Sequence, residues 1–269
     1  MRILFLGGGN MATALIGGML QQGFQPHELR VVDVSEQARE RLQRQFRVNA
    51  SVRLDGEIAE DAILLAVKPQ QMRAVADQLR AHLRGQLVIS IAAGIRTGDL
   101  ARWLGGHERI VRAMPNTPAL IRSGVAGLFA PACVAQADRD AAQRILGAVG
   151  ATVWMHNEAD LDVVTAVSGS GPAYVFYFIE ALESAALELG LTGEQAHELA
   201  VQTFVGAAQL AAESGEPVAT LRERVTSKAG TTEAALQALE TDKIKHKIAR
   251  AVRAAAERSR QLGEEFGKL

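Results

Sequence analysis

The sequence predicts two domains of different class, an α/β domain over residues 1–157 and an all-helical domain over residues 158–269. Up to Met155, short β-branched runs alternate with amphipathic helical runs, which is typical of a parallel sheet with helices on both faces. Runs such as "AILLAV" lack polar alternation, as expected for strands buried on both faces. After Met155 the patterns are helical and no strong strand pattern appears.

The expected elements follow from these patterns in chain order. Strands are expected at residues 2–7, 29–34, 61–67, 86–92 and 108–114, and helices of the first domain at residues 11–23, 35–46 and 70–83. Helices of the second domain are expected at residues 158–190, 193–213, 217–225, 231–240 and 243–267. Pro172 and its neighbouring glycines should bend or restart the first of these helices.

Composition narrows the class of protein. A formal net charge of −1 gives no reason to expect nucleic acid or an anionic membrane as the main partner. Cys133 is the single cysteine, so an internal disulfide or a cysteine-based metal cluster is excluded, and a reducing cytoplasmic compartment fits best. The apolar run "PAYVFYFIEALESAALELGL" contains three glutamates, so it predicts a helix buried under other helices or another subunit rather than a membrane span.

The first chemical motif is "LFLGGGNMATAL", a G-x-G-x-x-A pattern between a strand and a helix. Gly7 permits the tight turn, Gly9 lets a pyrophosphate approach the backbone, and Ala12 keeps the helix close to the sheet. The N–H groups at the helix start would face the anion. The pattern therefore predicts a dinucleotide-binding Rossmann domain, the alternative being a tight turn that binds nothing.

The residue that would set cofactor preference is Asp33, at the end of the next strand. An acid at this position accepts a hydrogen bond from a ribose 2′-hydroxyl, which favours NAD over NADP. Ser35 follows closely, and Arg39 and Arg53 could reach the same region, so the preference stays open. The alternative role for Asp33 is to stabilise a turn or cap a helix.

Two polar loops follow later strands of the first domain. In "AVKPQ", Lys68 and Pro69 come directly after a strand, where ligands of such folds bind. In "MPNTPA", two prolines hold Asn116 rigidly enough to suit the nicotinamide and the substrate. The alternative for Lys68 and Pro69 is that they only end the strand and begin the next helix. The alternative for the Asn116 loop is a plain turn.

Two polar segments interrupt the helical half. Ser168 to Pro172 form either a kink or a place where small residues let another chain or a ligand come close. Residues 227–232 combine loop amides, hydroxyls and a helix start, which predicts an anion site. The alternative is that Thr231 or Thr232 caps the following helix, which would explain one hydroxyl but not the whole run.

Taken together, "GGGNMA", "AVKPQ", "MPNTPA", "SGSGPAY" and "VTSKAGTT" resemble, in this order, the pyrroline-5-carboxylate reductase family, from about residue 3 to residue 260. The resemblance implies reduction of L-1-pyrroline-5-carboxylate to L-proline by NADPH or NADH, the last step of proline biosynthesis. It also implies a Rossmann domain followed by an all-α dimerisation domain that interlocks with a second subunit. Larger rings of dimers also occur in the family.

The resemblance assigns roles to individual residues. It implies that Asn116 lies near the nicotinamide and the substrate, and that Gly230 and Thr231 bind the substrate. It implies that Ser227 and Thr232 act in catalysis, with the Thr232 hydroxyl directed at the ring nitrogen. No metal is implied. The implied cofactor-binding residues are Leu6, Gly7, Gly8, Gly9, Asn10, Met11, Ala12, Asp33, Ser35, Ala66, Val67, Lys68 and Pro69.

This sequence departs from the family at two of these places. Ala229 stands where the family usually has a glycine, which puts the backbone shape of the loop in question. Asp33 differs from the residue of many NADPH-preferring members. Two other functions stay open: a dehydrogenase of the β-hydroxy acid type, with Lys228 as the lysine of the loop, and a cofactor-binding protein without turnover.

The chemistry of the expected reaction is consistent with such a loop. Hydride transfer to an imine carbon needs no protein nucleophile, so the protein has to orient the partners and hold the carboxylate. Amides and hydroxyls do this without a charged base. Because a threonine hydroxyl is a poor acid, a positioning role is favoured over acid catalysis.

Overall fold

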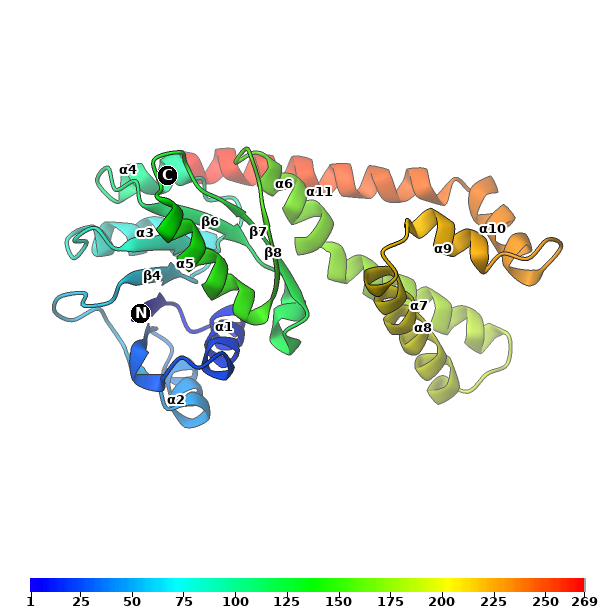
Figure 1. The fold of residues 1–269 in the computed structure, drawn as a ribbon, viewed down its shortest axis with the longest axis horizontal. Coiled ribbons are helices and arrows are strands. Elements are labelled where there is room, and N and C mark those ends of the chain that lie inside the picture. Colours follow the sequence, from blue (N-terminus) through cyan, green and yellow to red (C-terminus); the bar gives the residue numbers. More distant parts are fainter. Residues whose placement is uncertain (269) are drawn as a thin grey trace. The chain divides into compact units, whose positions relative to one another are not determined.

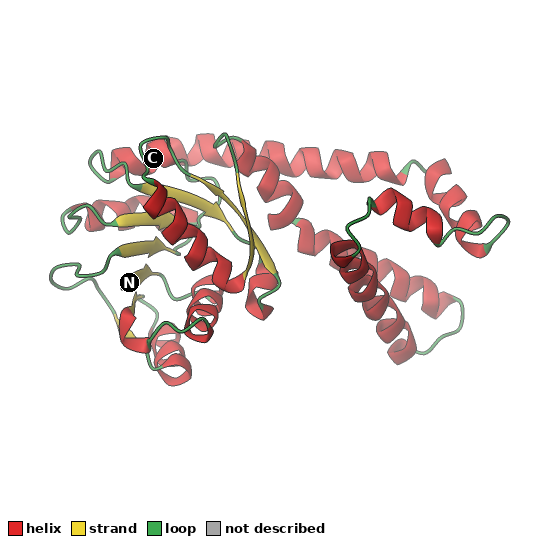
Figure 2. Cartoon of the chain, viewed as in Figure 1, coloured by secondary structure: helices red, strands yellow, loops and turns green. Residues whose placement is uncertain are grey.

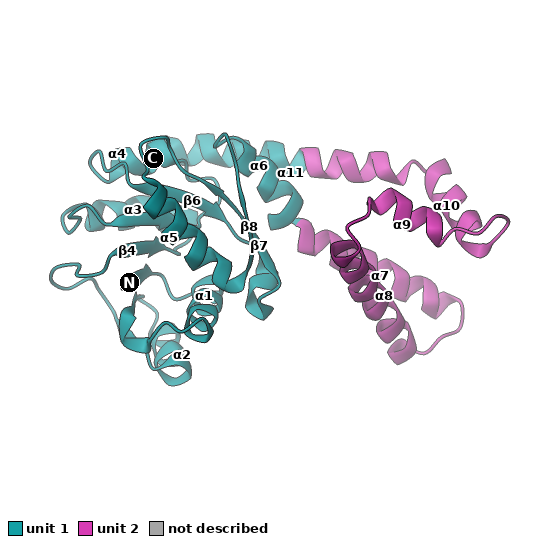
Figure 3. Ribbon diagram, in the orientation of Figure 1, with its two compact units in different colours: residues 1–170, 254–269 teal, residues 171–253 magenta. Residues whose placement is uncertain are grey.

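A computed structural model describes residues 1–268, which fall into two compact units (Figure 3). Unit 1 contains residues 1–170 and the chain from Ala254 onward, and unit 2 contains Gly171–Arg253. This division differs from the predicted boundary at residue 158. The reason is that Leu161 is fully buried in unit 1, and the hydroxyl of Ser259 donates to Asp162 Oδ1 at 2.6 Å.

Unit 1 is built on one eight-stranded sheet with the order β3-β2-β1-β4-β5-β6-β7-β8. The predicted parallel pairing is confirmed from β1 to β6, whereas β7 runs antiparallel to β6 and β8 runs parallel to β7. A short connection without a crossover helix joins β6 to β7, and such a connection cannot return the chain to a parallel strand. The strands are β1 Ile3–Leu6, β2 Leu29–Val32, β3 Asn49–Ser51, β4 Ala62–Leu65, β5 Leu87–Ser90, β6 Ile110–Met114, β7 Gly124–Phe129 and β8 Gly150–Trp154.

Helices cover both faces of this sheet (Figures 1 and 2). The first three of them were expected from the sequence and α6 lies within the helix expected at residues 158–190, whereas α4 and α5 were not expected. The α-helices are α1 Asn10–Gln21, α2 Glu36–Phe46, α3 Pro69–Arg80, α4 Thr97–Trp103, α5 Gln136–Leu146 and α6 Asp160–Val164. The 3-10 segments are η1 Pro26–Glu28, η2 Thr117–Ile121 and η3 Gly147–Val149, and a π-helix, η4, covers Thr165–Gly169.

The core of unit 1 consists of two apolar layers, one on each face of the sheet. Along β1, Ile3 and Phe5 pack into one layer while Leu4 and Leu6 pack into the other. Phe266 from the last helix also belongs to the second layer. This arrangement confirms that the unalternated apolar strands are buried on both faces.

Unit 2 consists of helices, as predicted. The helices are α7 Gly171–Glu188, α8 Gly193–Glu213, α9 Val218–Arg224, α10 Thr231–Thr241 and α11 Ile244–Gly267, the last of which continues into unit 1. The predicted interruption by the Ser168–Pro172 segment is confirmed, because a π-helix ends at Gly169 and α7 restarts at Gly171. Within residues 1–268, no helix combines the length and apolarity that crossing a bilayer would require.

Candidate active site

The glycine turn after β1 lies beside the carboxyl end of β4. The φ angle of Gly7 is 103°, and a Cβ atom at this position would lie 2.6 Å from the Ala66 carbonyl oxygen. The Ala66 N–H donates to the Leu6 carbonyl oxygen at 2.7 Å. The strand order reverses between β1 and β4, which is the place where ligands bind in open α/β sheets.

The first turn of α1 is open to an anion. Its N-cap is Gly9, and no heavy atom lies within 4 Å of the position that a Gly9 Cβ would take. The turn carries no acidic residue and no side-chain cap. Within the described chain, the N–H groups of Asn10, Met11 and Ala12 donate to no acceptor. These features fit the pyrophosphate of a dinucleotide.

Asp33 holds the backbone at the end of β2. Its Oδ2 accepts from the Gly8 N–H at 2.6 Å, and its Oδ1 accepts from the Ser35 N–H at 2.7 Å. Asp33 therefore has the turn-stabilising role considered above, and the Ser35 hydroxyl caps α2 by accepting from the Ala38 N–H at 3.3 Å. Each carboxylate oxygen retains a second lone pair, so ribose binding by Asp33 stays a prediction.

Two arginines lie close to the same turn. Arg39 Nη1 donates to the carbonyl oxygens of Asp33 and Val34 at 2.8 and 3.0 Å. Arg41 Nη2 donates to the Gly8 carbonyl oxygen at 2.9 Å. Arg53, in contrast, pairs with Asp55 at 2.9 Å. The predicted cofactor edge therefore carries a fixed carboxylate together with two cations bound to main-chain carbonyls.

Lys68 and Pro69 mark the start of α3. Lys68 is its N-cap, with an extended backbone, and Pro69 is its first residue, where a missing N–H is tolerated. The alternative role is therefore confirmed: Lys68 and Pro69 end the segment after β4 and begin the next helix. The roles of Lys68, Val67 and Pro69 in cofactor binding stay predictions.

Asn116 joins three segments of unit 1 and is 9% exposed. Its Oδ1 accepts from the Val125 N–H at 2.9 Å, and its Nδ2 donates to the Ser168 carbonyl oxygen at 3.1 Å. The sequence did not reveal this link, because Ser168 lies 52 residues further along the chain. Asn116 thus holds the proline-bracketed loop against β7 and η4, and its proximity to nicotinamide and substrate stays a prediction.

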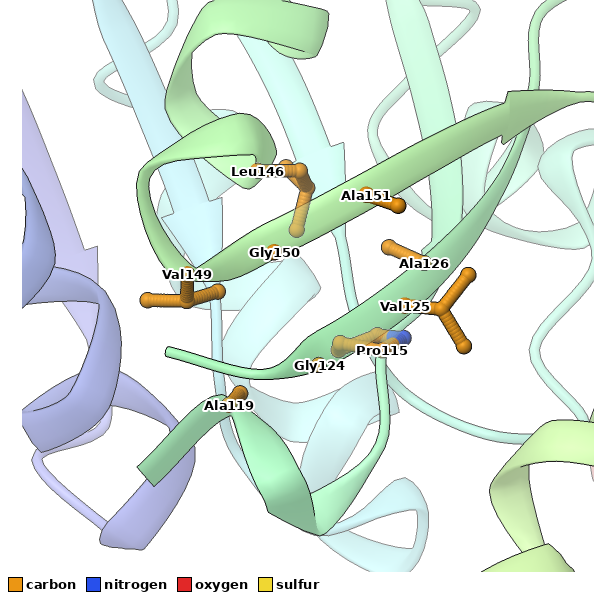
Figure 4. A pocket seen from close by; sticks show the side chains of 9 residues that line it. All are labelled: Pro115, Ala119, Gly124, Val125, Ala126, Leu146, Val149, Gly150 and Ala151. Carbon is orange, nitrogen blue, oxygen red and sulfur yellow. The ribbon is translucent and has the colours of Figure 1, made fainter. Parts of the chain in front are cut away.

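An apolar pocket lies beside this loop (Figure 4). None of its lining side chains is polar, so it suits neither a carboxylate nor a phosphate. The apolar side chains that line it pack the loop against β7 and β8. The lining residues are Pro115, Ala119, Gly124, Val125, Ala126, Leu146, Val149, Gly150 and Ala151.

In unit 2, residues 227–232 lead into α10. The N-cap of α10 is Gly230 and no side chain caps the helix, so the alternative in which Thr231 or Thr232 is the cap is wrong. Within residues 1–268, the hydroxyls of Ser227, Thr231 and Thr232 make no hydrogen bond, and neither do the N–H groups of these two threonines. The segment therefore presents hydroxyls and a helix N-terminus that can bind a carboxylate.

The shape of this loop depends on two small residues. Ala229 has a φ angle of 59°, in the left-handed region. A Cβ atom at Gly230 would lie 2.3 Å from the Ser227 hydroxyl oxygen, so a side chain at this position would force the Ser227 hydroxyl to move. The Ala229 N–H donates to Glu233 Oε2 at 2.6 Å. Sequence reasoning missed Glu233, although a glutamate at the third residue of a helix often reaches back in this way.

Comparison with known families divides the chain in two. Residues 158–262 match the family described as pyrroline-5-carboxylate reductase dimerisation, which begins where the sequence predicts the second domain to begin. Residues 2–94 match the family described as NADP oxidoreductase coenzyme F420-dependent. Both regions agree with an α/β domain followed by a helical one.

Two relatives that match nearly the whole chain are both named pyrroline-5-carboxylate reductase. Pyrroline-5-carboxylate reductase of Pseudomonas aeruginosa is 44% identical over 99% of this chain and 98% of its own length. The Escherichia coli protein of that name is 36% identical over 98% of both chains.

Solved structures agree with this result. The pyrroline-5-carboxylate reductase of Coxiella burnetii has a TM-score of 0.92 and 40% identity, covering 97% of this chain and 98% of that one. The Plasmodium falciparum pyrroline carboxylate reductase with NADP bound has a TM-score of 0.85 and 30% identity, covering 98% of both chains. With near-complete coverage by relatives of this identity, the chain belongs to the pyrroline-5-carboxylate reductase family.

Proposed function

We propose that this protein reduces L-1-pyrroline-5-carboxylate to L-proline, the last step of proline biosynthesis, with NADPH or NADH as the hydride donor. The observation that carries the proposal is the 227–232 segment. Its three uncommitted hydroxyls precede and begin a helix whose first N–H groups are free. Such a segment can bind a small carboxylate without introducing a charged base.

The residues of unit 1 fit the nucleotide. The open first turn of α1 and the glycine turn against Ala66 would hold the pyrophosphate, and Asp33 would lie at the ribose. When bound, the reduced nicotinamide supplies a hydride to the imine carbon. The same unit holds its rigid Asn116 loop at the carboxyl end of β6.

The residues of unit 2 would orient the substrate. The N–H groups of Thr231 and Thr232 bind the carboxylate, and the Ser227 hydroxyl adds a donor. The Thr232 hydroxyl positions the ring nitrogen, which takes a proton from solvent water when the imine carbon gains the hydride. Because a threonine hydroxyl is a poor acid, Thr232 orients the ring rather than supplying that proton.

The experiment follows the loss of reduced nicotinamide absorbance with pyrroline-5-carboxylate and either cofactor. For Thr232→Ala we expect a loss in kcat/KM on the order of tenfold or more, because one positioned hydrogen bond to the substrate is removed. Thr241→Ala, at the other end of α10, is the matched control and should leave the kinetics unchanged. Equal kinetics for Thr232→Ala and wild type would remove Thr232 from the site.

The same assay separates the two other functions. A dehydrogenase of the β-hydroxy acid type would act on such acids and lose that activity in Lys228→Ala. A cofactor sensor would bind the nucleotide, as seen by calorimetry, and oxidise neither NADPH nor NADH in the presence of pyrroline-5-carboxylate.

Unit 2 belongs to a region that matches a dimerisation family, and we propose that the working form is a homodimer. On α7, Phe176 and Tyr177 are 66% and 69% exposed in the single chain, and Leu199 and Leu210 of α8 are 59% and 56% exposed. Large apolar side chains gathered on neighbouring helices are typical of an interface. Sedimentation would reveal the dimer, or a larger ring of dimers, and a monomer at micromolar concentration would contradict the proposal.

We propose the cytoplasm as the location of the protein, since the exposed thiol of Cys133 suits a reducing compartment.

A further inference from the structure

The substrate-loop candidate contains a residue in an unfavourable backbone conformation. Ala229 has a φ angle of 59°, where the Cβ atom of an L-residue crowds the backbone. Glycine would adopt this conformation without that penalty. An alanine therefore keeps the turn only if neighbouring contacts hold it there.

Glu233 provides a direct side-chain contact of this kind. Its Oε2 accepts from the Ala229 N–H at 2.6 Å, a short hydrogen bond to a charged acceptor. Glu233 lies in the first turn of α10, where a negative charge is also favourable. One carboxylate thus ties the turn at residue 229 to the start of the helix.

The tie keeps Ser227 beside the helix start. The Gly230 N–H donates to the Ser227 carbonyl oxygen at 3.0 Å, and the Ser227 hydroxyl oxygen occupies space that a Gly230 Cβ would need. If the turn at Ala229 opened, Ser227 would lose this position. Glu233 leaves the N–H groups of Thr231 and Thr232 free, because its own hydrogen bond goes to the loop behind them.

We propose that Glu233 is a positioning residue for substrate binding, which holds residues 227–230 in the shape that presents the Ser227 hydroxyl at the start of α10. The role rests on the proposed function of this segment. Glu233 acts through the Ala229 N–H and does not contact the substrate. Its carboxylate also repels the substrate carboxylate, so removal of the charge and removal of the hydrogen bond should have opposite effects.

Three variants separate these effects. Glu233→Gln keeps an acceptor for the Ala229 N–H without the charge, and its KM for pyrroline-5-carboxylate should equal or fall below that of the wild type. Glu233→Ala removes the tie, and this KM should rise about fivefold or more, the loss of one hydrogen bond to a charged group, with the KM for the nucleotide unchanged. Adding Ala229→Gly to Glu233→Ala should restore a large part of the loss. Glu240→Ala, which removes an exposed carboxylate at the other end of α10, is the control.

A second measurement does not depend on turnover. Amide hydrogen exchange of the peptide around residue 229 should quicken in Glu233→Ala and stay slow in Glu233→Gln. Unchanged exchange and unchanged KM in Glu233→Ala would overturn the proposal. Equal damage to kcat by Gln and Ala would also overturn it, because a carboxylate needed for chemistry would explain that result. A wild type inactive on pyrroline-5-carboxylate would instead reject the proposed function and the substrate role with it, while exchange would still report whether Glu233 holds the loop.

Discussion

We predict that Asp33 sets the choice between NADH and NADPH, and Asp33→Asn tests this prediction directly. The carboxylate is fixed in place by the N–H groups of Gly8 and Ser35, at 2.6 and 2.7 Å. It therefore cannot turn away from a nucleotide that places its ribose at the end of β2. Asparagine has nearly the same shape and removes the charge, but its NH2 group also replaces one of the two acceptors, so one of these backbone hydrogen bonds is lost as well.

The size of the effect follows from Coulomb's law. A 2′-phosphate about 5 Å from the carboxylate, in a half-exposed site with a water-like dielectric constant, is repelled by about 2 kcal/mol. That energy corresponds to roughly a thirtyfold change in kcat/KM. In addition, NADH would lose part of a hydrogen bond from its 2′-hydroxyl, an effect of about 1 kcal/mol. The ratio of kcat/KM for NADPH to that for NADH should therefore rise by about one to two orders of magnitude in the variant.

The assay measures the ratio of kcat/KM for NADPH to that for NADH in the wild type and in the variant. The ionic strength is held constant, because exposed charges are screened by salt. Asp77→Asn, which removes an exposed carboxylate paired with Arg73 on α3, is the control. If Asp33→Asn leaves the ratio unchanged while Arg39→Ala selectively weakens NADPH, the reasoning is refuted. Arg39 would then neutralise the 2′-phosphate, and the role of Asp33 would be confined to the turn.

Two further predictions concern stability. Burial lowers the pKa of His107, whose Nε2 is buried without a hydrogen-bond partner among the described residues. In the unfolded chain His107 binds a proton near pH 6.5, whereas in the folded chain it binds a proton only at lower pH. The free energy of unfolding should therefore fall as the pH drops from about 6.5 towards 5. In His107→Gln the melting temperature should fall less over this pH range than in the wild type. His246→Gln, on α11, is the control and should behave as the wild type does. If the melting temperatures of His107→Gln and the wild type fall in parallel with pH, the reasoning is wrong. Separately, a Cβ atom at Gly18 would lie 2.3 Å from the Ala148 carbonyl oxygen, so Gly18→Ala should destabilise the protein by about 2 kcal/mol in denaturant unfolding. Gly98→Ala, where no atom lies within 4 Å of the new Cβ, is the control, and equal stability of the two variants would contradict the packing argument.

Sequence reasoning succeeded where the determining contacts are local. The turn at Gly7, the open helix start after Gly9 and the restart of the helix at Gly171 all follow from rules for neighbouring residues. It failed for β7, whose sequence "GVAGLF" has two glycines and whose direction depends on a short connection rather than on its own residues. The Asn116 link to Ser168 was also out of reach, because no local pattern pairs positions so far apart.

Each unit has one helix start that is predicted to receive an anion, and the two helices avoid repulsion of that anion in different ways. A helix that receives an anion at its N-terminus must keep its own acids from taking the free N–H groups. The helix α1 does so by having no acid in its first turn. The helix α10 does carry one, Glu233, but directs it backwards to the Ala229 N–H. Since substrate and product of the proposed reaction both bear a carboxylate, the charge of Glu233 weakens the binding of both while its hydrogen bond keeps the loop in shape. On the proposed function, we expect this arrangement to speed the release of L-proline while the binding geometry is kept.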